Sequence, residues 1–201
     1  YDGNTFPEKE WIITESNIPR RSFGEYIGSD EAQRNYIIKA VAACQMNDIQ
    51  QLHIYQLGDL GTEANAINEF FLMGLYHRLD SVPQYRQKVT TAGIAYHTVS
   101  MLLKNKEFDS LRTAQLQLPP GIRGGAFRDE HGLYTYLLCA ATGRDLSEEA
   151  SAVYTFPASL NIRALHRKEW DFSSVRLTKI AEAGAIRLTG SPVFLTETDT
   201  T

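Results

Sequence analysis

The first half of the chain alternates short apolar runs with one long amphipathic segment. Residues 11–14 (Trp-Ile-Ile-Thr) form an apolar, β-branched run that is typical of a buried strand. From Ala32 to Met46, apolar residues recur at intervals of three and four, which predicts a helix that starts near Ser29–Glu31. Residues 49–57 have the pattern of a second strand, which ends at Gly58–Asp59. A strand, a helix and a strand in this order predict a βαβ unit with parallel strands.

The next segment, residues 60–81, is long for a connection between two elements. Connections of this length are usually functional or contain short elements of their own. Residues 84–103 then show helical periodicity and end at Lys104–Lys106, where cations suit the helix C-terminus. We therefore expect a long loop followed by a second helix.

The pattern changes near Leu118–Gly121 to short, strand-length runs separated by turn residues. Asp129–Gly132 is a hairpin turn signal between two of these runs. Short strands at this spacing predict an antiparallel β-sandwich. We expect two domains, residues 1–112 and 113–201, and the strands of the second over residues 122–128, 133–141, 150–156, 162–166, 174–178, 185–189 and 193–196.

Composition excludes several classes of protein. The 201 residues are 43% hydrophobic and 22% charged, with a net charge of −4, which is typical of a globular chain and excludes disorder. No run approaches the roughly 18 apolar residues of a membrane span. The mild acidity gives no electrostatic footprint for nucleic acid. Cys44 and Cys139 cannot form a disulfide scaffold, and we expect both to be buried. Ten tyrosines and nine phenylalanines fit either buried aromatic packing or stacking on flat or sugar-like ligands.

Glu15 is the leading candidate for a catalytic residue because it directly follows an apolar strand in a predicted parallel α/β unit. In α/β barrels the carboxyl ends of the strands present the catalytic groups, and a carboxylate there can act in glycoside hydrolysis. The alternative is structural: Glu15 caps the following turn or pairs with Arg20 or Arg21.

Residues 11–17 (Trp-Ile-Ile-Thr-Glu-Ser-Asn) resemble the seventh barrel strand of clan A glycoside hydrolases, which ends in the nucleophilic glutamate. Further segments follow in the order of that clan. Residues 30–46 resemble its seventh helix, 52–57 its eighth strand and 84–103 its eighth helix. The second half resembles the C-terminal β-sandwich attached to many such barrels, through residues 127–129, 132–136 and 185–195. The resemblance implies the last strands and helices of a (β/α)8 TIM barrel followed by an antiparallel β-sandwich, similar to family 39.

The same resemblance implies a retaining glycoside hydrolase that acts on oligo- or polysaccharides by double displacement, without a cofactor or a metal. Glu15 is then the nucleophile, and Tyr55, Gln56, Asp59 and Asn17 bind the carbohydrate substrate. Enzymes of this class favour a secreted or periplasmic location.

The acid/base of that clan follows an Asn at the end of the fourth strand, which would lie upstream of this sequence. The resemblance therefore implies that the barrel is completed by an upstream part of the same polypeptide or by a companion chain. The one Asn-Glu pair, Asn68-Glu69, follows the presumed eighth strand. We do not transfer the acid/base role to it and expect an ordinary solvated glutamate.

Two other functions stay open. The chain could be a non-catalytic carbohydrate-binding or scaffold module, because many sugar-binding modules are β-sandwiches. It could also be an unrelated two-domain protein, which would place Glu15 in a surface turn. Trp170 could be a sugar-stacking platform, although we expect a packing anchor instead. The histidines form no metal-ligand spacing, and His53 is expected to pack or to form a hydrogen bond.

Overall fold

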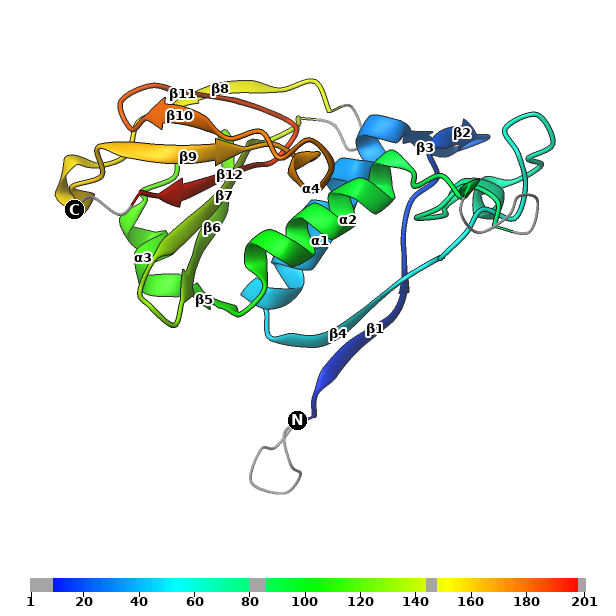
Figure 1. Cartoon of the computed structure of the whole chain (residues 1–201), viewed down its shortest axis with the longest axis horizontal. Coiled ribbons are helices and arrows are strands. Elements are labelled where there is room, and N and C mark those ends of the chain that lie inside the picture. The colour runs from blue at the N-terminus through cyan, green and yellow to red at the C-terminus, as the bar shows by residue number, and fades with distance from the viewer. Residues whose placement is uncertain (1–8, 80–85, 144–147, 199–201) are drawn as a thin grey trace.

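The computed structural model describes residues 9–79, 86–143 and 148–198. Two helices, α1 (Asp30–Met46) and α2 (Thr91–Leu103), lie side by side at its centre. A large antiparallel sheet lies on one side of them, and the strands β1 (Trp11–Ser16) and β4 (Ile49–Ile54) extend on another (Figure 1). β1 and β4 pair in parallel, with α1 between them in sequence, so the predicted βαβ unit is confirmed.

The large sheet has six strands in the order β10-β9-β12-β7-β6-β5, and every neighbouring pair is antiparallel. Its strands are β5 (Lys106–Asp109), β6 (Ile122–Asp129), β7 (Tyr134–Ala140), β9 (Ala164–Lys168), β10 (Lys179–Glu182) and β12 (Val193–Glu197). A separate antiparallel pair is formed by β8 (Ser151–Tyr154) and β11 (Ile186–Thr189).

Short elements complete the described part of the chain. They are the hairpin strands β2 (Arg21–Phe23) and β3 (Tyr26–Ser29), the helices α3 (Ser110–Gln115) and α4 (Phe172–Val175), and the 3-10 turns η1 (Glu69–Leu72) and η3 (Ala158–Leu160).

The central strand β7 is buried on both faces. Since side chains alternate along a strand, Tyr136 and Leu138 face one core while Leu137 faces another. The first core lies between the sheet and the β8–β11 pair, which contributes Tyr154 and Leu188. The second lies between the sheet and the two helices. Its buried members are Ile38, Ala42, Ala95, Val99, Leu103, Phe127, Leu137 and Phe194.

The predicted division of the chain at residues 112 and 113 stays a prediction. Two observations bear on how the parts relate. β5 belongs to the large sheet, although its residues precede that division. The helices of the first part also share a core with the sheet of the second, so the two parts pack as one body.

Several predicted elements are confirmed, one helix begins later than predicted, and one strand is wrong. The strands expected over residues 122–128, 133–141, 185–189 and 193–196 are present with small shifts of their ends. The helix expected over 84–103 begins only at Thr91, because the Thr90 hydroxyl caps it by accepting a hydrogen bond from Gly93 N at 3.1 Å. Residues 84 and 85 lie outside the described residues.

The strand expected over residues 174–178 is wrong. Residues 172–175 form one turn of helix, and β10 starts later, at Lys179. Tertiary contacts explain the difference. Ser173 N donates to Thr98 Oγ1 at 2.9 Å, and Ser173 Oγ donates to Ile94 O at 3.0 Å, which fixes this turn on α2. The sequence patterns also missed β5, α3 and the β2–β3 hairpin.

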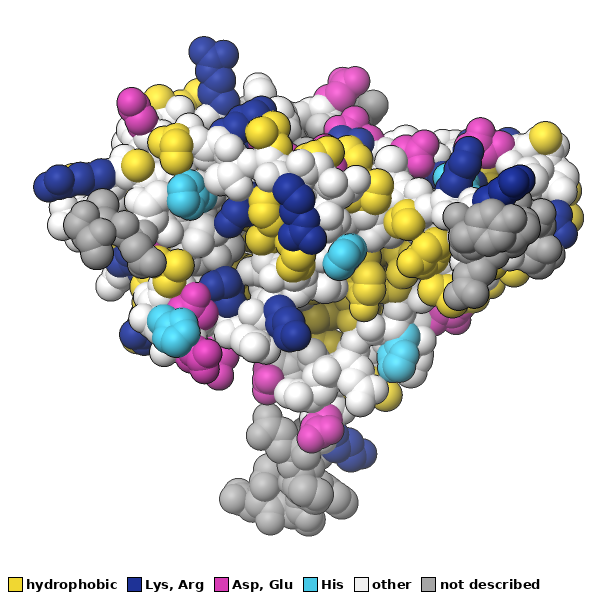
Figure 2. Space-filling view, viewed as in Figure 1, with side chains coloured by type: hydrophobic (Ala, Val, Ile, Leu, Met, Phe, Trp, Pro, Cys, Tyr) yellow, Lys and Arg dark blue, Asp and Glu magenta, His cyan; other side chains and the backbone are white. Residues whose placement is uncertain are grey.

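The expectation that β1 is buried is wrong, although it is a strand. Trp11 is 72% exposed and Ile12 is 49% exposed. The described residues supply only β1 and β4 to this sheet, so nothing in them covers its outer face or pairs with its two outer edges. Hydrophobic side chains also gather on the surface beside α2 (Figure 2). A groove of about 570 Å³ lies there, lined in part by Leu57, Val89 and Tyr96.

Cys44 and Cys139 are both free and buried, as expected. Among the described residues, no helix combines the length and the apolar character needed to cross a membrane.

Candidate active site

Glu15 is the second-last residue of β1, and its side chain points away from the helices. The following residue, Ser16, forms a hydrogen bond with the hydroxyl of Tyr36 on α1, so the Ser16 side chain faces the helices. The pairing of β1 with β4 is irregular between Ile13 and Ser16, and Thr14 and Glu15 are both exposed there, whereas Ile13 and Ser16 are partly buried. Glu15 therefore lies on the open face of the strand pair. Its side chain is exposed. Glu15 is therefore part of a strand and not of a surface turn.

Neither arginine proposed as a structural partner of Glu15 pairs with it. Arg20 donates to Asp59 at 2.6 Å. Arg21 donates to the carbonyl oxygens of Glu63, at 2.6 Å, and Ala66, at 3.2 Å. Both guanidinium groups are thus engaged by the loop that follows β4, and the Glu15 carboxylate is left on the open face of the strand pair.

Tyr55 lies on the same face of the strand pair as Glu15. Tyr55 N donates to Ser16 O at 3.0 Å, so the parallel pairing continues one residue beyond β4. Ile54 packs with Ile37 and Leu75 on the helix side, and the next side chain therefore points to the opposite face. The Tyr55 ring meets the Phe70 ring edge to face, with centroids 5.9 Å apart. The peptide bond between Tyr55 and Gln56 is cis.

Asn17 and Gln56 use their side-chain amide groups to hold the backbone of the loop after β4. Asn17 Nδ2 donates to Met73 O at 2.7 Å. Gln56 Nε2 donates to Phe70 O at 2.7 Å, and Gln56 N donates to Met73 O at 3.2 Å. Each strand end thus contributes one amide that fixes the same short stretch of loop. Both contacts hold the loop in place at the strand ends.

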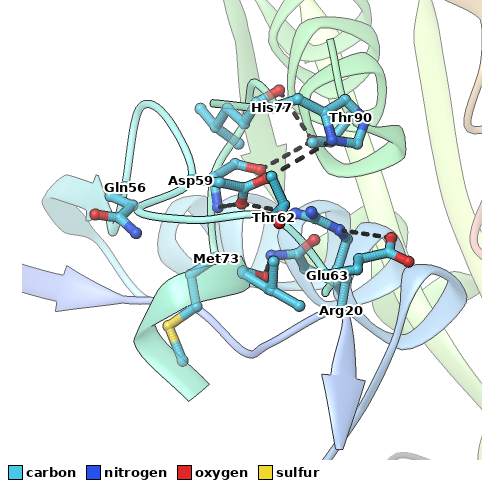
Figure 3. Close-up of polar contacts among 12 residues, drawn as sticks. Arg20, Gln56, Asp59, Thr62, Glu63, Met73, His77 and Thr90 are labelled. Carbon is cyan, nitrogen blue, oxygen red and sulfur yellow. Dashed lines mark hydrogen bonds and ion pairs between the residues drawn. The ribbon is translucent and has the colours of Figure 1, made fainter. Parts of the chain in front are cut away.

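Asp59 forms a buried ion pair with Arg20 (Figure 3). The two side chains are 1% and 3% exposed, and Asp59 Oδ1 accepts from both Arg20, at 2.6 Å, and Gly74 N, at 2.9 Å. The close approach requires glycine at position 74, where a Cβ would lie 2.3 Å from Asp59 N. Asp59 therefore ties the loop to the connection between β1 and β2.

The second oxygen of Asp59 is buried without a hydrogen-bond partner among the described residues. His77 Nδ1 lies 3.6 Å from it. Glu63 lies 3.7 Å from Arg20 Nε and extends the ion pair to the surface. A cavity of about 460 Å³ opens beside this cluster, with Lys88 also in its lining.

The loop after β4 contains the turn η1, which Asn68 precedes and in which Glu69 and Phe70 lie. Asn68 caps the turn η1, its Oδ1 accepting from Phe70 N at 3.2 Å. Glu69, expected to be solvated, is half-buried in that turn, and Phe70 is 45% exposed. The pair Asn68-Glu69 did mark the turn, since Asn is a favoured cap and Glu suits a first turn.

Trp170 is a packing anchor, as expected. It packs against the core between the helices and the sheet, and the Arg34 guanidinium lies 4.4 Å from its ring centroid. The described residues bring no three His, Cys, Asp or Glu side chains together as metal ligands.

A second polar cluster lies in the sheet, remote in sequence from Glu15. Arg112 of α3 donates to Tyr136 at 3.0 Å and to Glu197 at 2.8 Å. Burial, with the Glu197 carboxylate adding to it, holds the pKa of Tyr136 far above its usual range. Each member of this cluster has a partner inside it, so the cluster serves to join α3 to β7 and β12.

Comparisons with known proteins add information on the fold. No protein-family model matches the sequence, and no curated protein matches it. Among solved structures, the chain is similar to a family 39 glycoside hydrolase from the gut symbiont Bacteroides cellulosilyticus WH2. The TM-score is 0.68 at 17% identity, over 95% of this chain and 34% of that one.

Two other solved structures are similar to the chain with lower scores. One is an endo-β1,6-glucanase, with a TM-score of 0.45 and 14% identity over 98% of this chain and 37% of that one. The other is the family 51 arabinofuranosidase from Xanthomonas axonopodis pv. citri, with a TM-score of 0.48 and 10% identity over 94% and 41%. The chain spans about a third of the length of the family 39 enzyme, and it shares the fold of that part of a glycoside hydrolase.

Proposed function

We propose that this chain is part of a retaining glycoside hydrolase that cleaves oligo- or polysaccharides, and that Glu15 is its nucleophile. The observation that carries the proposal is the place of Glu15: an exposed carboxylate at the carboxyl end of a parallel strand, on the face turned away from the helices. Tyr55 of the neighbouring strand end shares that face. The fold similarity to a glycoside hydrolase supports the same assignment.

In this mechanism a Glu15 oxygen attacks the anomeric carbon and the glycosidic C–O bond breaks. A second carboxylic acid gives its proton to the leaving oxygen. The glycosyl ester on Glu15 is then hydrolysed by water, which returns a proton to that second carboxylate. The two carboxyl groups of such a pair are roughly 5–5.5 Å apart in retaining enzymes.

The second carboxylic acid belongs, in this proposal, to a part of the enzyme outside this chain. The open sheet supports a missing part. Parallel strands normally lie in sheets that are covered on both faces, whereas β1 and β4 leave Trp11 and Ile12 exposed. We propose that an upstream part of the same polypeptide or a companion chain adds the remaining parallel strands and closes the barrel.

The decisive experiment is Glu15→Gln, tested in the preparation that contains every polypeptide of the enzyme. We expect turnover to be lost while sugar binding is kept, because the amide has the same shape but is not a nucleophile. A 2-deoxy-2-fluoroglycoside should add its glycosyl mass to the peptide that contains Glu15. The matched control is Glu10→Gln, at an exposed glutamate just before β1. This variant should keep the turnover of the parent and the labelling of the peptide that contains Glu15.

Full activity of Glu15→Gln would refute the assignment. The alternative of a non-catalytic carbohydrate-binding or scaffold module predicts sugar binding without turnover in the parent protein. The denatured mass of each polypeptide in that preparation tests the missing part. A longer or second polypeptide is expected, and hydrolysis by the 22.6 kDa chain alone would contradict the proposed division of the active site.

A further inference from the structure

The turn η1 is fixed over the carboxyl ends of both parallel strands. Asn17, just after β1, holds Met73 O, and Gln56, just after β4, holds both Phe70 O and Met73 O. Leu60 N donates to Phe71 O at 3.1 Å and closes the loop on itself. The backbone of Phe70 therefore has a fixed position relative to the strand ends.

The Phe70 side chain projects from this turn as an exposed ring. It is 45% exposed, and it rests edge to face on Tyr55, whose ring lies on the Glu15 face. An isolated exposed aromatic residue needs no explanation in itself. Phe70 differs because Gln56 holds its carbonyl oxygen and Asn68 holds its amide nitrogen. Its ring is also supported by the ring of Tyr55, whose backbone pairs with Ser16, the residue after Glu15.

We propose that Phe70 is a substrate-binding residue whose ring face packs on the apolar C–H face of a sugar unit next to the one that Glu15 attacks. This inference rests on the proposed function. Aromatic side chains that line a site with a few fixed polar groups are typical of ligand recognition. Asn17 and Gln56 act as positioning residues, because they hold the turn that presents the ring.

The proposed contact sets the minimum size of the ligand. Because the sugar unit that packs on Phe70 is not the one that Glu15 attacks, the ligand is an oligosaccharide of at least two units.

The size of the effect follows from the exposed area. Burying a whole Phe side chain is worth about 1.5–3 kcal/mol, and just under half of this ring is open. Covering that part corresponds to a roughly three- to tenfold change in binding.

The test uses cellotriose, xylotriose and laminaritriose as probes, with binding measured by calorimetry in the Glu15→Gln background. Adding Phe70→Ala should weaken binding of the best-bound trisaccharide by roughly three- to tenfold. Phe70→Tyr, which keeps the ring face, should restore binding. Ile67→Ala, a 79% exposed residue of the same loop, is the matched control and should have no effect. In enzyme with Glu15 intact, Phe70→Ala should raise KM for the trisaccharide but not for an aryl monoglycoside.

Unchanged trisaccharide binding in Phe70→Ala would overturn the inference, and so would the absence of binding by all three trisaccharides. An equal rise of KM for the trisaccharide and the aryl monoglycoside would overturn it too. These failures are separate from failure of the proposed function, which is shown by turnover that survives Glu15→Gln.

Discussion

Asp59→Ala should destabilise the protein through the buried ion pair with Arg20. In the parent, Asp59 Oδ1 accepts hydrogen bonds from Arg20 and from Gly74 N, and both charged side chains are almost wholly buried. Alanine at position 59 removes the negative charge and the acceptor together. The Arg20 guanidinium then stays in a buried position without its partner.

Loss of one partner from a buried ion pair costs about 3–5 kcal/mol. The lower end applies here, because Glu63 lies 3.7 Å from Arg20 Nε and offers a partial substitute. For a domain of this length, each kcal/mol lowers Tm by roughly 2–4 °C. A loss of about 3 kcal/mol therefore corresponds to a fall in Tm of roughly 6–12 °C.

The assay combines thermal unfolding, followed by circular dichroism, with hydrogen exchange. Because the pair ties a loop to the rest of the fold, residues 58–77 should also exchange faster than in the parent. Asp59→Asn should fall between parent and Asp59→Ala, since its amide oxygen still accepts from Gly74 N. The double variant Arg20→Met/Asp59→Leu should recover most of the loss, because it leaves no buried charge.

A Tm and an exchange rate equal to those of the parent would refute this reasoning for Asp59→Ala. If that variant kept its stability and lost sugar binding, Asp59 would instead be the substrate contact that its position after β4 predicts.

Two further predictions concern the large sheet and the β8–β11 pair that shares a core with it. Gly124→Ala should lower the free energy of unfolding, measured with denaturant, by at least about 2 kcal/mol, because φ is +142° and a Cβ would lie 1.8 Å from Leu137 O. The control is Gly121→Ala, whose Cβ would meet nothing within 4 Å and which should leave stability unchanged. Equal stabilities of the two variants would contradict this prediction. Burial raises the pKa of Tyr154 to about 12, so its neutral form contributes stability that is present below about pH 10 and lost as pH rises towards 12. Tyr154→Phe should therefore lose less stability between pH 8 and 11 than the parent, and an equal loss would argue against it.

Local patterns predicted the elements whose signals lie within a few residues. The β1–α1–β4 unit follows from two apolar runs and a helix that Ser29 caps, its Oγ accepting from Ala32 N at 3.0 Å. The start of α2 had a local signal too, in the Thr90 cap, but apolar periodicity extended the predicted helix past it. The strand expected at 174–178 failed because Ser173 bonds to α2, a contact across more than 70 positions of sequence.

The candidate site divides in the same way. The position of Glu15 depends on where one strand ends, which the sequence shows directly. Asn17 and Gln56 bind backbone atoms of a loop 14 to 56 residues away, and Asp59 binds Gly74 N of that loop and the Arg20 side chain, 39 residues away. No pattern in the sequence predicts these partners. Phe70 could not be selected for the same reason, since its neighbour Tyr55 is fixed by strand pairing and its own place by the loop.

Because β7 is buried on both faces, the C-terminal part of the chain depends on the helices for its stability. A fragment that starts at residue 113 would lose β5 and both long helices, and it would expose the side of the sheet that bears Phe127, Leu137 and Phe194. Such a fragment could not be transplanted as an independent module. The helices and the sheet should instead unfold in one cooperative transition. A destabilising substitution in α1 or α2 should therefore also destabilise the packing around Tyr154, on the far side of the sheet.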